Sequence, residues 1–189
     1  MSTHPTLETA RLKLRPYTEA DIPELLPLIG TREVAATTLR IAYPYTAQDA
    51  KAFLQLAKDP DKLWLAITLR SDDRQIGGIG LRIDTQHQHA ELGYWLGVPF
   101  WGQRYATEAA SEMVRYGFDT LALHRIFASH FKHNPHSDEN WNAARGLPAR
   151  ASAQTGSVRR LRTVRDPPPG MGGTRVECQM RWRCKSQFT

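Results

Sequence analysis

The amino-acid sequence predicts a mixed β-sheet flanked by helices, in the α+β or α/β class. Two observations carry this prediction. Short segments with alternating or continuous apolar residues, typical of strands, are interspersed with longer segments whose apolar residues recur at helical spacing. Their order along the chain is strand, helix, helix, three strands, helix and strand. The length of 189 residues is sufficient for one such domain with a buried core.

The first half of the chain begins with a strand and two helices. "ARLKLRPY" (10–17) alternates apolar and charged residues, as a half-exposed strand does. "TEADIPELLPLIG" (18–30) predicts a helix that Thr18 caps and Gly30 ends. "TAQDAKAFLQLAKD" (46–59) predicts a second helix. One of its faces is apolar and is formed by Ala50, Phe53, Leu54 and Ala57.

Three strands, a helix and a last strand follow. The strands are predicted for "KLWLAITLR", "QIGGIGLRID" and "AELGYWLG", and the turn "SDDR" joins the first two as a hairpin. "ATEAASEMVRYGFDTL" (106–121) has the strongest helical pattern of the chain. Its core positions are Ala109, Met113, Tyr116 and Leu121. "RIFASHFKHN" (125–134) is the next strand.

The stretch "VPFWGQRYATEAA" (98–110) points to an anion site. A tight Gly-Gln-Arg-Tyr turn ends an apolar segment, and a helix begins at once with Ala106 and Thr107. A helix N-terminus offers unpaired backbone N–H groups and the positive end of the helix dipole, which together attract phosphate. An ordinary strand-to-helix connection is the alternative.

The distribution of charge argues against a nucleic-acid-binding surface on the main body of the chain, and nucleic-acid binding through a basic tail is the less favoured alternative. Residues 1–137 hold 15 Lys+Arg and 15 Asp+Glu, whereas residues 138–189 hold 10 basic and 4 acidic residues and so carry the whole net charge of +6. Both cysteines, Cys178 and Cys184, also lie in the last segment. The start of the chain is polar, and no apolar run is long enough to span a bilayer. We expect a cytoplasmic protein without nucleic-acid or membrane partners.

Several motifs in the same order resemble the GCN5-related N-acetyltransferases (GNAT). They are "LETARLKLRPYTEADI", "AELGYWLG", "WGQRYATEA" and "NPHS", and the resemblance covers about residues 7 to 137. The chain is most similar to the branch of ribosomal-protein N-terminal acetyltransferases (RimJ/RimL-like). The resemblance implies acetyl-CoA as co-substrate, no metal, and an amine acceptor. The acceptor could be a ribosomal or other protein N-terminus, an amino acid, a polyamine or an antibiotic.

The resemblance places the pyrophosphate of CoA on the turn described above. The residues implied are Gly102, Gln103, Arg104, Tyr105, Ala106 and Thr107. Trp101 replaces a polar residue of the family pattern, and Arg104 replaces its central glycine. A Cβ at position 104 is strained if the loop needs a positive φ, while the guanidinium could pair with a CoA phosphate. The alternative for Arg104 is a solvated surface side chain.

The strand before the turn is implied to hold the pantetheine arm of CoA. The backbone of Tyr94, Trp95 and Leu96 would do this, and an N–H near Leu96 would stabilise the oxyanion. A splay between this strand and 125–134 would admit the thioester, with a bulge at Gly93. The alternative is that Tyr94 and Trp95 are ordinary core aromatics.

The chemistry requires a proton acceptor for the amine and a proton donor for the thiolate. The resemblance gives the first role to Glu91, for which an exposed or salt-bridged carboxylate is the alternative. His130 and His133 are the other candidate bases. In the RimJ/RimL-like branch, Ser137 resembles the general acid and Asn134 a residue that hydrogen-bonds pantetheine. A helix cap is the alternative for Ser137.

The resemblance ends after Ser137. Residues 138–189 are basic and rich in Pro, Gly and Arg, which predicts a disordered tail. Codons that could encode this segment also permit, in a shifted reading frame, amino-acid strings similar to the last helix and strands of the family. We therefore interpret residues 138–189 as the product of a non-native reading frame. We therefore expect the C-terminal strands to be missing and the strand 125–134 to keep an exposed edge, through which the chain could form a homodimer. An impaired CoA-binding or interaction module is the alternative function.

Overall fold

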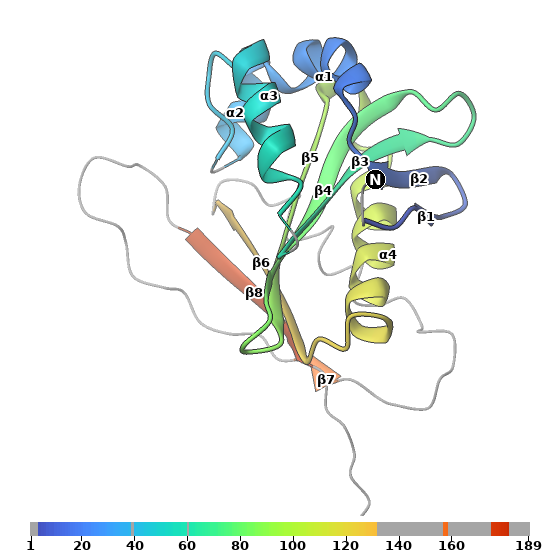
Figure 1. The fold of residues 1–189 in the computed structure, drawn as a ribbon, viewed down its shortest axis with the longest axis vertical. Helices are drawn as coiled ribbons and strands as arrows, with labels where there is room; N and C mark the ends of the chain where they lie inside the picture. The colour runs from blue at the N-terminus through green and yellow to red at the C-terminus, as the bar shows by residue number, and fades with distance from the viewer. Residues whose placement is uncertain (1–3, 39, 60, 132–156, 159–174, 182–189) are drawn as a thin grey trace, which may run out of the picture.

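A mixed eight-stranded sheet forms the centre of the protein. The computed structural model describes residues 4–38, 40–59, 61–131, 157–158 and 175–181. The strand order is β1-β2-β3-β4-β5-β6-β8-β7 (Figure 1). The strands are β1 Leu7–Glu8, β2 Leu12–Pro16, β3 Lys62–Leu69, β4 Gln75–Asp84, β5 His89–Leu96, β6 Arg125–Phe131, β7 Ser157–Val158 and β8 Arg175–Arg181. β5 and β6 are parallel, and the other neighbours are antiparallel.

Helices cover both faces of the sheet. They are the 3₁₀ turns η1 Glu19–Asp21 and η2 Val98–Phe100 and the helices α1 Ile22–Ile29, α2 Arg32–Thr37, α3 Ala47–Leu56 and α4 Tyr105–Asp119. α4 packs along one face, and α1 to α3 gather over one end of the opposite face (Figure 1). The prediction of a mixed sheet flanked by helices is confirmed. Among the described residues, no helix combines the length and apolar character that crossing a membrane requires.

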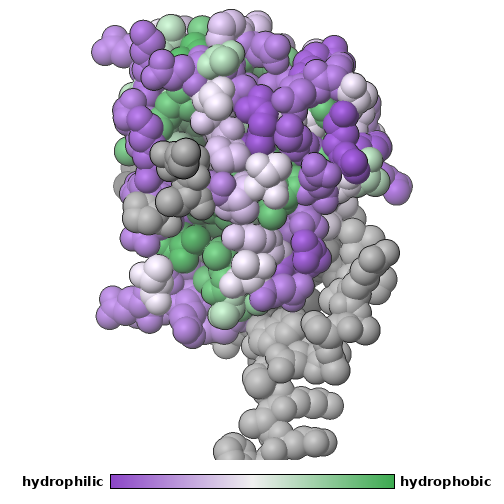
Figure 2. Space-filling view, turned by 45° about the vertical axis from the view of Figure 1, so that its right-hand side comes forward, coloured by the Kyte–Doolittle hydropathy of each residue, from purple (hydrophilic) through white to green (hydrophobic). Residues whose placement is uncertain are grey.

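The alternation of side chains along β5 separates a core from a functional face. Ala90 and Leu92 are buried in the main core under α4, whereas Glu91, Gly93 and Trp95 face the side of α1 and α3. Most of the buried positions of α4 are small residues. The buried residues are Ala106, Ala109, Ala110, Met113, Val114 and Gly117. On the face shown in Figure 2, most residues are hydrophilic, and hydrophobic ones show in separate patches.

The helical segment 18–56 contains one element that the sequence pattern does not predict. α2 is a six-residue helix that begins after Thr31, whose hydroxyl accepts a hydrogen bond from the Val34 N–H at 3.4 Å. The predicted first helix opens as η1, where the Asp21 carboxylate accepts hydrogen bonds from the N–H and hydroxyl of Thr18 at 2.6 and 3.1 Å. Val34 then joins α1 and α3 in a second small core.

β8 corrects the expectation that the C-terminal strands are missing. It pairs with β6 from Arg125↔Arg181 to Phe131↔Arg175, so β6 has a neighbour on the side where an exposed edge was expected. The sequence of β8, "RVECQMR", alternates apolar and polar residues, and β6 offers it a full set of backbone partners. Apart from β7 and β8, the predictions of disorder and of a shifted frame for 138–189 concern residues outside the described ranges.

Candidate active site

β5 and β6 separate at the position where the sequence predicts a splay. Their parallel pairing runs from His89↔Arg125 to Leu92↔Ala128 and then stops, although both strands continue. Figure 1 shows the two strands diverging. The predicted bulge is not the cause, because the pairing of β5 with β4 stays in register through Gly93. A Cβ built on Gly93 meets nothing within 4 Å, so the backbone beside the gap is open.

The register of β5 determines which backbone groups face this gap. The Gly97 N–H donates to the Ile76 carbonyl at 2.9 Å, which makes Leu96↔Gly77 a non-hydrogen-bonded pair. Tyr94 and Leu96 therefore direct their N–H and C=O groups away from β4, on the side of the gap. The Leu96 carbonyl already accepts a hydrogen bond from Trp101 Nε1 at 2.8 Å. The backbone groups of Trp95 pair with β4, so only two of the three predicted backbone positions lie in place to hold pantetheine.

The turn before α4 adopts the conformation that the phosphate-site prediction requires. Gly102 has φ +75° and Arg104 has φ +63°. Arg104 thus occupies the left-handed region, at a cost of about 1–2 kcal/mol relative to glycine. It is the N-cap residue of α4, and no side chain caps this helix start. The N–H groups from Gly102 to Thr107 surround one helix N-terminus, as an anion site needs.

Arg11 and Glu108 fasten this turn to the sheet. The Glu108 carboxylate accepts hydrogen bonds from the Thr9 hydroxyl at 2.6 Å and from the Arg11 Nε at 2.7 Å. Burial alone would raise the pKa of Glu108, but the hydrogen bonds from Thr9 and Arg11 hold it below its usual value. The Arg11 guanidinium also donates to the Gln103 carbonyl at 3.2 Å and lies 4.4 Å from the ring centre of Tyr105. Arg11 is a positioning residue that the motif comparison missed.

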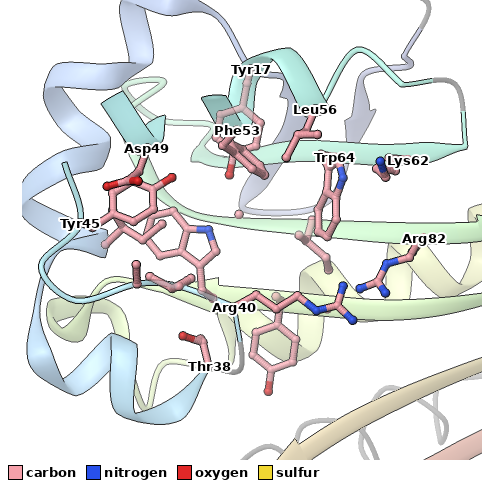
Figure 3. A pocket seen from close by; sticks show the side chains of 18 of the residues that line it. Tyr17, Thr38, Arg40, Tyr45, Asp49, Phe53, Leu56, Lys62, Trp64 and Arg82 are labelled. Carbon is pink, nitrogen blue, oxygen red and sulfur yellow. The ribbon is translucent and has the colours of Figure 1, made fainter. Parts of the chain in front are cut away.

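A cavity of about 490 Å³ lies on the face of the sheet opposite α4. α1, α3 and the segment around Arg40 form its walls, and β3, β4 and β5 form its floor (Figure 3). The cavity reaches Gly93 on β5 and Ala128 and Ser129 on β6, where the two strands separate. Its aromatic lining residues are Tyr17, Tyr45, Phe53, Trp64, Tyr94 and Trp95. The gap and the cavity therefore meet.

Two glycines of β4 make room for the aromatic floor. A Cβ at Gly78 would clash with the Tyr17 hydroxyl and lie 2.6 Å from the Trp95 Nε1. A Cβ at Gly80 would likewise overlap the indole of Trp64. These rings lie directly on the strand backbone, which explains "IGGIG" in a strand where glycine is otherwise unfavourable. The glycines are the sequence signal that could have revealed the cavity.

Glu91 projects into this cavity between two arginines. Its Oε2 lies 3.4 Å from Arg40 Nη2 and 3.3 Å from Arg82 Nη2, and its side chain is 16% exposed. The predicted proton acceptor thus lines the cavity, and the salt-bridge alternative is also realised. The remaining predicted residues His133, Asn134 and Ser137 lie outside the described residues, as does the side chain of His130.

One group of side chains in the described part of the chain could hold a metal ion. Asp84, His87 and His89 bring one ligand atom each to within 4.8 Å of one another at the β4–β5 turn. In the metal-free arrangement, His87 Nδ1 lies 3.0 Å from Asp84 Oδ2. The group lies where β5 begins, so it is separate from the gap, which starts at Gly93.

The chain matches a known family and curated relatives. The family model described as "Acetyltransferase (GNAT) domain" matches residues 11–139. The uncharacterized N-acetyltransferase p20 of Bacillus licheniformis is 34% identical over 129 residues, 65% of this chain and 71% of the relative. The uncharacterized N-acetyltransferase YoaA of Bacillus subtilis (strain 168) is 30% identical over 138 residues, 71% of this chain and 78% of the relative.

Solved structures share the fold. A GNAT-family acetyltransferase from Bacillus anthracis has a TM-score of 0.75 at 18% identity, with 93% of this chain and 96% of that chain covered. The Microcin C7 self-immunity acetyltransferase MccE, described in complex with acetyl-CoA and AMP, has a TM-score of 0.73 at 17% identity, with 92% and 93% covered. At these identities the likeness is one of fold.

Proposed function

Because the chain belongs to the GNAT family of N-acetyltransferases, we propose that it transfers the acetyl group of acetyl-CoA to a primary amine. The observation that carries this proposal is the junction of the gap with the cavity, at Gly93, Ala128 and Ser129. A thioester in the gap and an amine in the cavity would meet there. An enzyme that joins two substrates gains most of its rate from such positioning.

The donor side is proposed to consist of the turn before α4 and the end of β5. The N–H groups from Gly102 to Thr107 would receive the pyrophosphate of acetyl-CoA, and Arg104 would add a charged contact. The backbone of Tyr94 and Leu96 faces the gap and would pair with the pantetheine arm. Asn134 would contribute a further hydrogen bond to that arm. A protein of the same fold is described with acetyl-CoA bound, which supports this assignment.

The reaction requires a neutral amine that attacks the thioester carbonyl. A nitrogen–carbon bond forms and the carbon–sulfur bond breaks, while the Leu96 N–H would stabilise the negative charge that develops on the carbonyl oxygen. Glu91 would take the proton that the amine loses, and Ser137 would give a proton to the departing thiolate. Arg40 and Arg82 fix the Glu91 carboxylate at the cavity wall.

We also propose that the chain belongs to the RimJ/RimL-like branch and acts in the cytoplasm. The Asn134-to-Ser137 spacing supports the first statement, and the neutral, cysteine-free composition of residues 1–137 supports the second.

The proposal is tested by measuring CoA release from acetyl-CoA with a panel of primary amines. Glu91→Gln and Ser137→Ala should each lower turnover by about 10²-fold and leave acetyl-CoA affinity unchanged, because each removes one proton-transfer group. Glu33→Gln, on an exposed part of α2, is the matched control. Acetyl-CoA binding without turnover on any amine would instead show a non-catalytic CoA-binding module.

A further inference from the structure

One end of the cavity is mainly aromatic, and the two charged residues beside it, Asp49 and Lys62, are engaged with Thr46 and Asp59. The ring centres of Tyr17 and Phe53 lie 5.2 Å apart, and those of Phe53 and Trp64 lie 5.9 Å apart, both edge to face. Burial raises the pKa of the Tyr45 hydroxyl to about 12 and raises that of Tyr17 further, so both hydroxyls stay protonated at neutral pH. This end suits an apolar group.

The other end is cationic. Figure 3 shows the guanidinium groups of Arg40 and Arg82 close together, on the far side of the cavity from Tyr45. Both approach a single oxygen, Oε2 of Glu91, so two positive charges meet one negative charge. A guanidinium has five N–H donors, and one shared carboxylate oxygen leaves donors for a further acceptor. An anion would complete the charge balance.

The two carboxylates among the described cavity residues, Asp49 and Glu91, both already accept hydrogen bonds or pair with charges within the protein. This argues against an acceptor with several positive charges. Asp49 accepts hydrogen bonds from the Thr46 N–H at 2.8 Å and from its hydroxyl at 2.6 Å, in the capping box of α3. Glu91 is held by the two arginines. A polyamine would therefore find Asp49 as its one described carboxylate outside the arginine cluster, and its other ammonium group would lie near two arginines.

From these three observations, and resting on the proposed function, we propose that the acceptor is a small apolar amino acid with a free carboxylate. Its carboxylate pairs with Arg40 and Arg82, and its apolar side chain packs among Tyr17, Phe53 and Trp64. Its amine then lies between the two ends, beside Glu91 and toward the gap at Gly93. A protein N-terminus has an amide at the place of the carboxylate and so lacks the charge that the two arginines complement. The cavity volume is within the range of small-molecule sites.

The test compares kcat/KM for matched pairs of acceptors. L-phenylalanine and L-leucine are each compared with their amides, which differ only in the missing carboxylate charge. Wild-type protein should prefer each acid over its amide by about tenfold or more, as for a charge-assisted hydrogen bond. The amine of an amide loses its proton more readily, so unassisted reactivity would favour the opposite order.

Arginine variants identify the groups responsible. Arg82→Gln and, separately, Arg40→Gln should bring the acid-to-amide ratio to near one. Because each arginine also holds Glu91, turnover of both acceptors should fall, and the ratio is the quantity that tests the inference. Lys51→Gln, an exposed position of α3 that does not line the cavity, should keep the wild-type ratio. Unchanged acetyl-CoA affinity by calorimetry shows that each variant is folded. If one arginine variant fails to fold, the other variant and the acid-to-amide ratio of the wild type still test the inference.

Three outcomes separate this inference from the proposed function. Equal rates with acid and amide in the wild type, or an unchanged ratio in both arginine variants, overturn the inference. Preferred turnover of spermidine or of a peptide beginning with Phe also overturns it and leaves the N-acetyltransferase function standing. Acetyl-CoA binding without acetylation of any amine, peptide or amino acid overturns the function itself.

Discussion

At the scale of single residues, the pair of Arg15 and Asp21 fixes the entry into the helical segment. The Arg15 guanidinium donates to both carboxylate oxygens of Asp21, at 2.7 and 3.0 Å, and the Thr18 N–H donates to the same carboxylate at 2.6 Å. Burial would raise the pKa of Asp21, but the hydrogen bonds from Arg15 and Thr18 and the charge of Arg15 lower it overall. The pair joins β2 to η1 and α1, which form one wall of the cavity.

Asp21→Asn should lower the free energy of unfolding at pH 7 by about 2 kcal/mol, because it leaves the half-buried Arg15 with only the longer contact to Asp73, at 3.6 Å. The folded pKa of Asp21 lies below the unfolded value of about 3.9. Its contribution is therefore complete above pH 4 and is lost as the pH falls through the folded pKa. Urea unfolding at pH 7 and at pH 3 should show the difference between wild type and variant shrinking in acid. Asp72→Asn, an exposed carboxylate paired with Arg74 at 3.7 Å, should change stability by less than about 0.5 kcal/mol at either pH. An equal difference in unfolding free energy between wild type and Asp21→Asn at pH 7 and pH 3 would contradict the proposed link between Asp21 ionisation and stability.

At the scale of elements, the start of α4 combines a strained backbone with a charged side chain, and two substitutions separate them. Arg104→Gly should raise the free energy of unfolding by about 0.5–1 kcal/mol, because glycine adopts φ +63° without strain but has more freedom when unfolded. Arg104→Ala keeps the strain. Both variants should bind CoA several-fold more weakly, since both lose the guanidinium.

Titration calorimetry with CoA and with dephospho-CoA locates the contact of Arg104. Loss of affinity for both ligands assigns it to the pyrophosphate, and loss for CoA alone assigns it to the 3′-phosphate. Wild-type affinity of both variants for both ligands would show that Arg104 is a surface residue without a role in binding.

Helices and strands whose own residues show a hydrophobic period could be predicted from the sequence. Elements that depend on contacts with distant segments could not. Leu12 and Leu14 in β2 and Ala109 and Met113 in α4 follow the spacing of their element, and all four are fully buried. α2 has only six residues, too few to show a helical period in the sequence. The sequence of β8 alternates apolar and polar residues. The prediction of disorder nevertheless covered β8, because it was based on the composition of the whole segment 138–189.

The candidate site divides in the same way. The turn 102–107 and Glu91 were found because motifs are local in sequence. Tyr17, Arg40 and Trp64 come from three separate segments, and only the fold brings them together with Glu91 in one cavity. No spacing in the chain reveals such a group, and only the glycines of β4 hinted at it.

At the scale of the whole molecule, β8 decides whether the sheet ends at β6. The parallel pairing of β5 with β6 directs the backbone groups of Ile126 and Ala128 toward β8. In the register of β6 and β8, the amides of Val176, Cys178 and Met180 then bond to β6. Glu177 and Gln179 direct theirs to the opposite side, where the described pairing of β7 reaches only Met180 and Arg181.

Hydrogen exchange followed by NMR should therefore show an alternating pattern in β8. The amides of Val176, Cys178 and Met180 should exchange slowly, and those of Glu177 and Gln179 fast, because only the first set donates to a strand. Removal of residues 175–189 should speed the exchange of Ile126 and Ala128 and, by exposing the β6 edge, produce concentration-dependent association in sedimentation experiments. Uniformly fast exchange over 175–181, with β6 protected to the same degree in full-length and shortened protein, would instead show that the segment lies outside the sheet. In that case the original expectation of a sheet ending at β6 would stand, and self-association of the full-length protein through that edge would be the expected result.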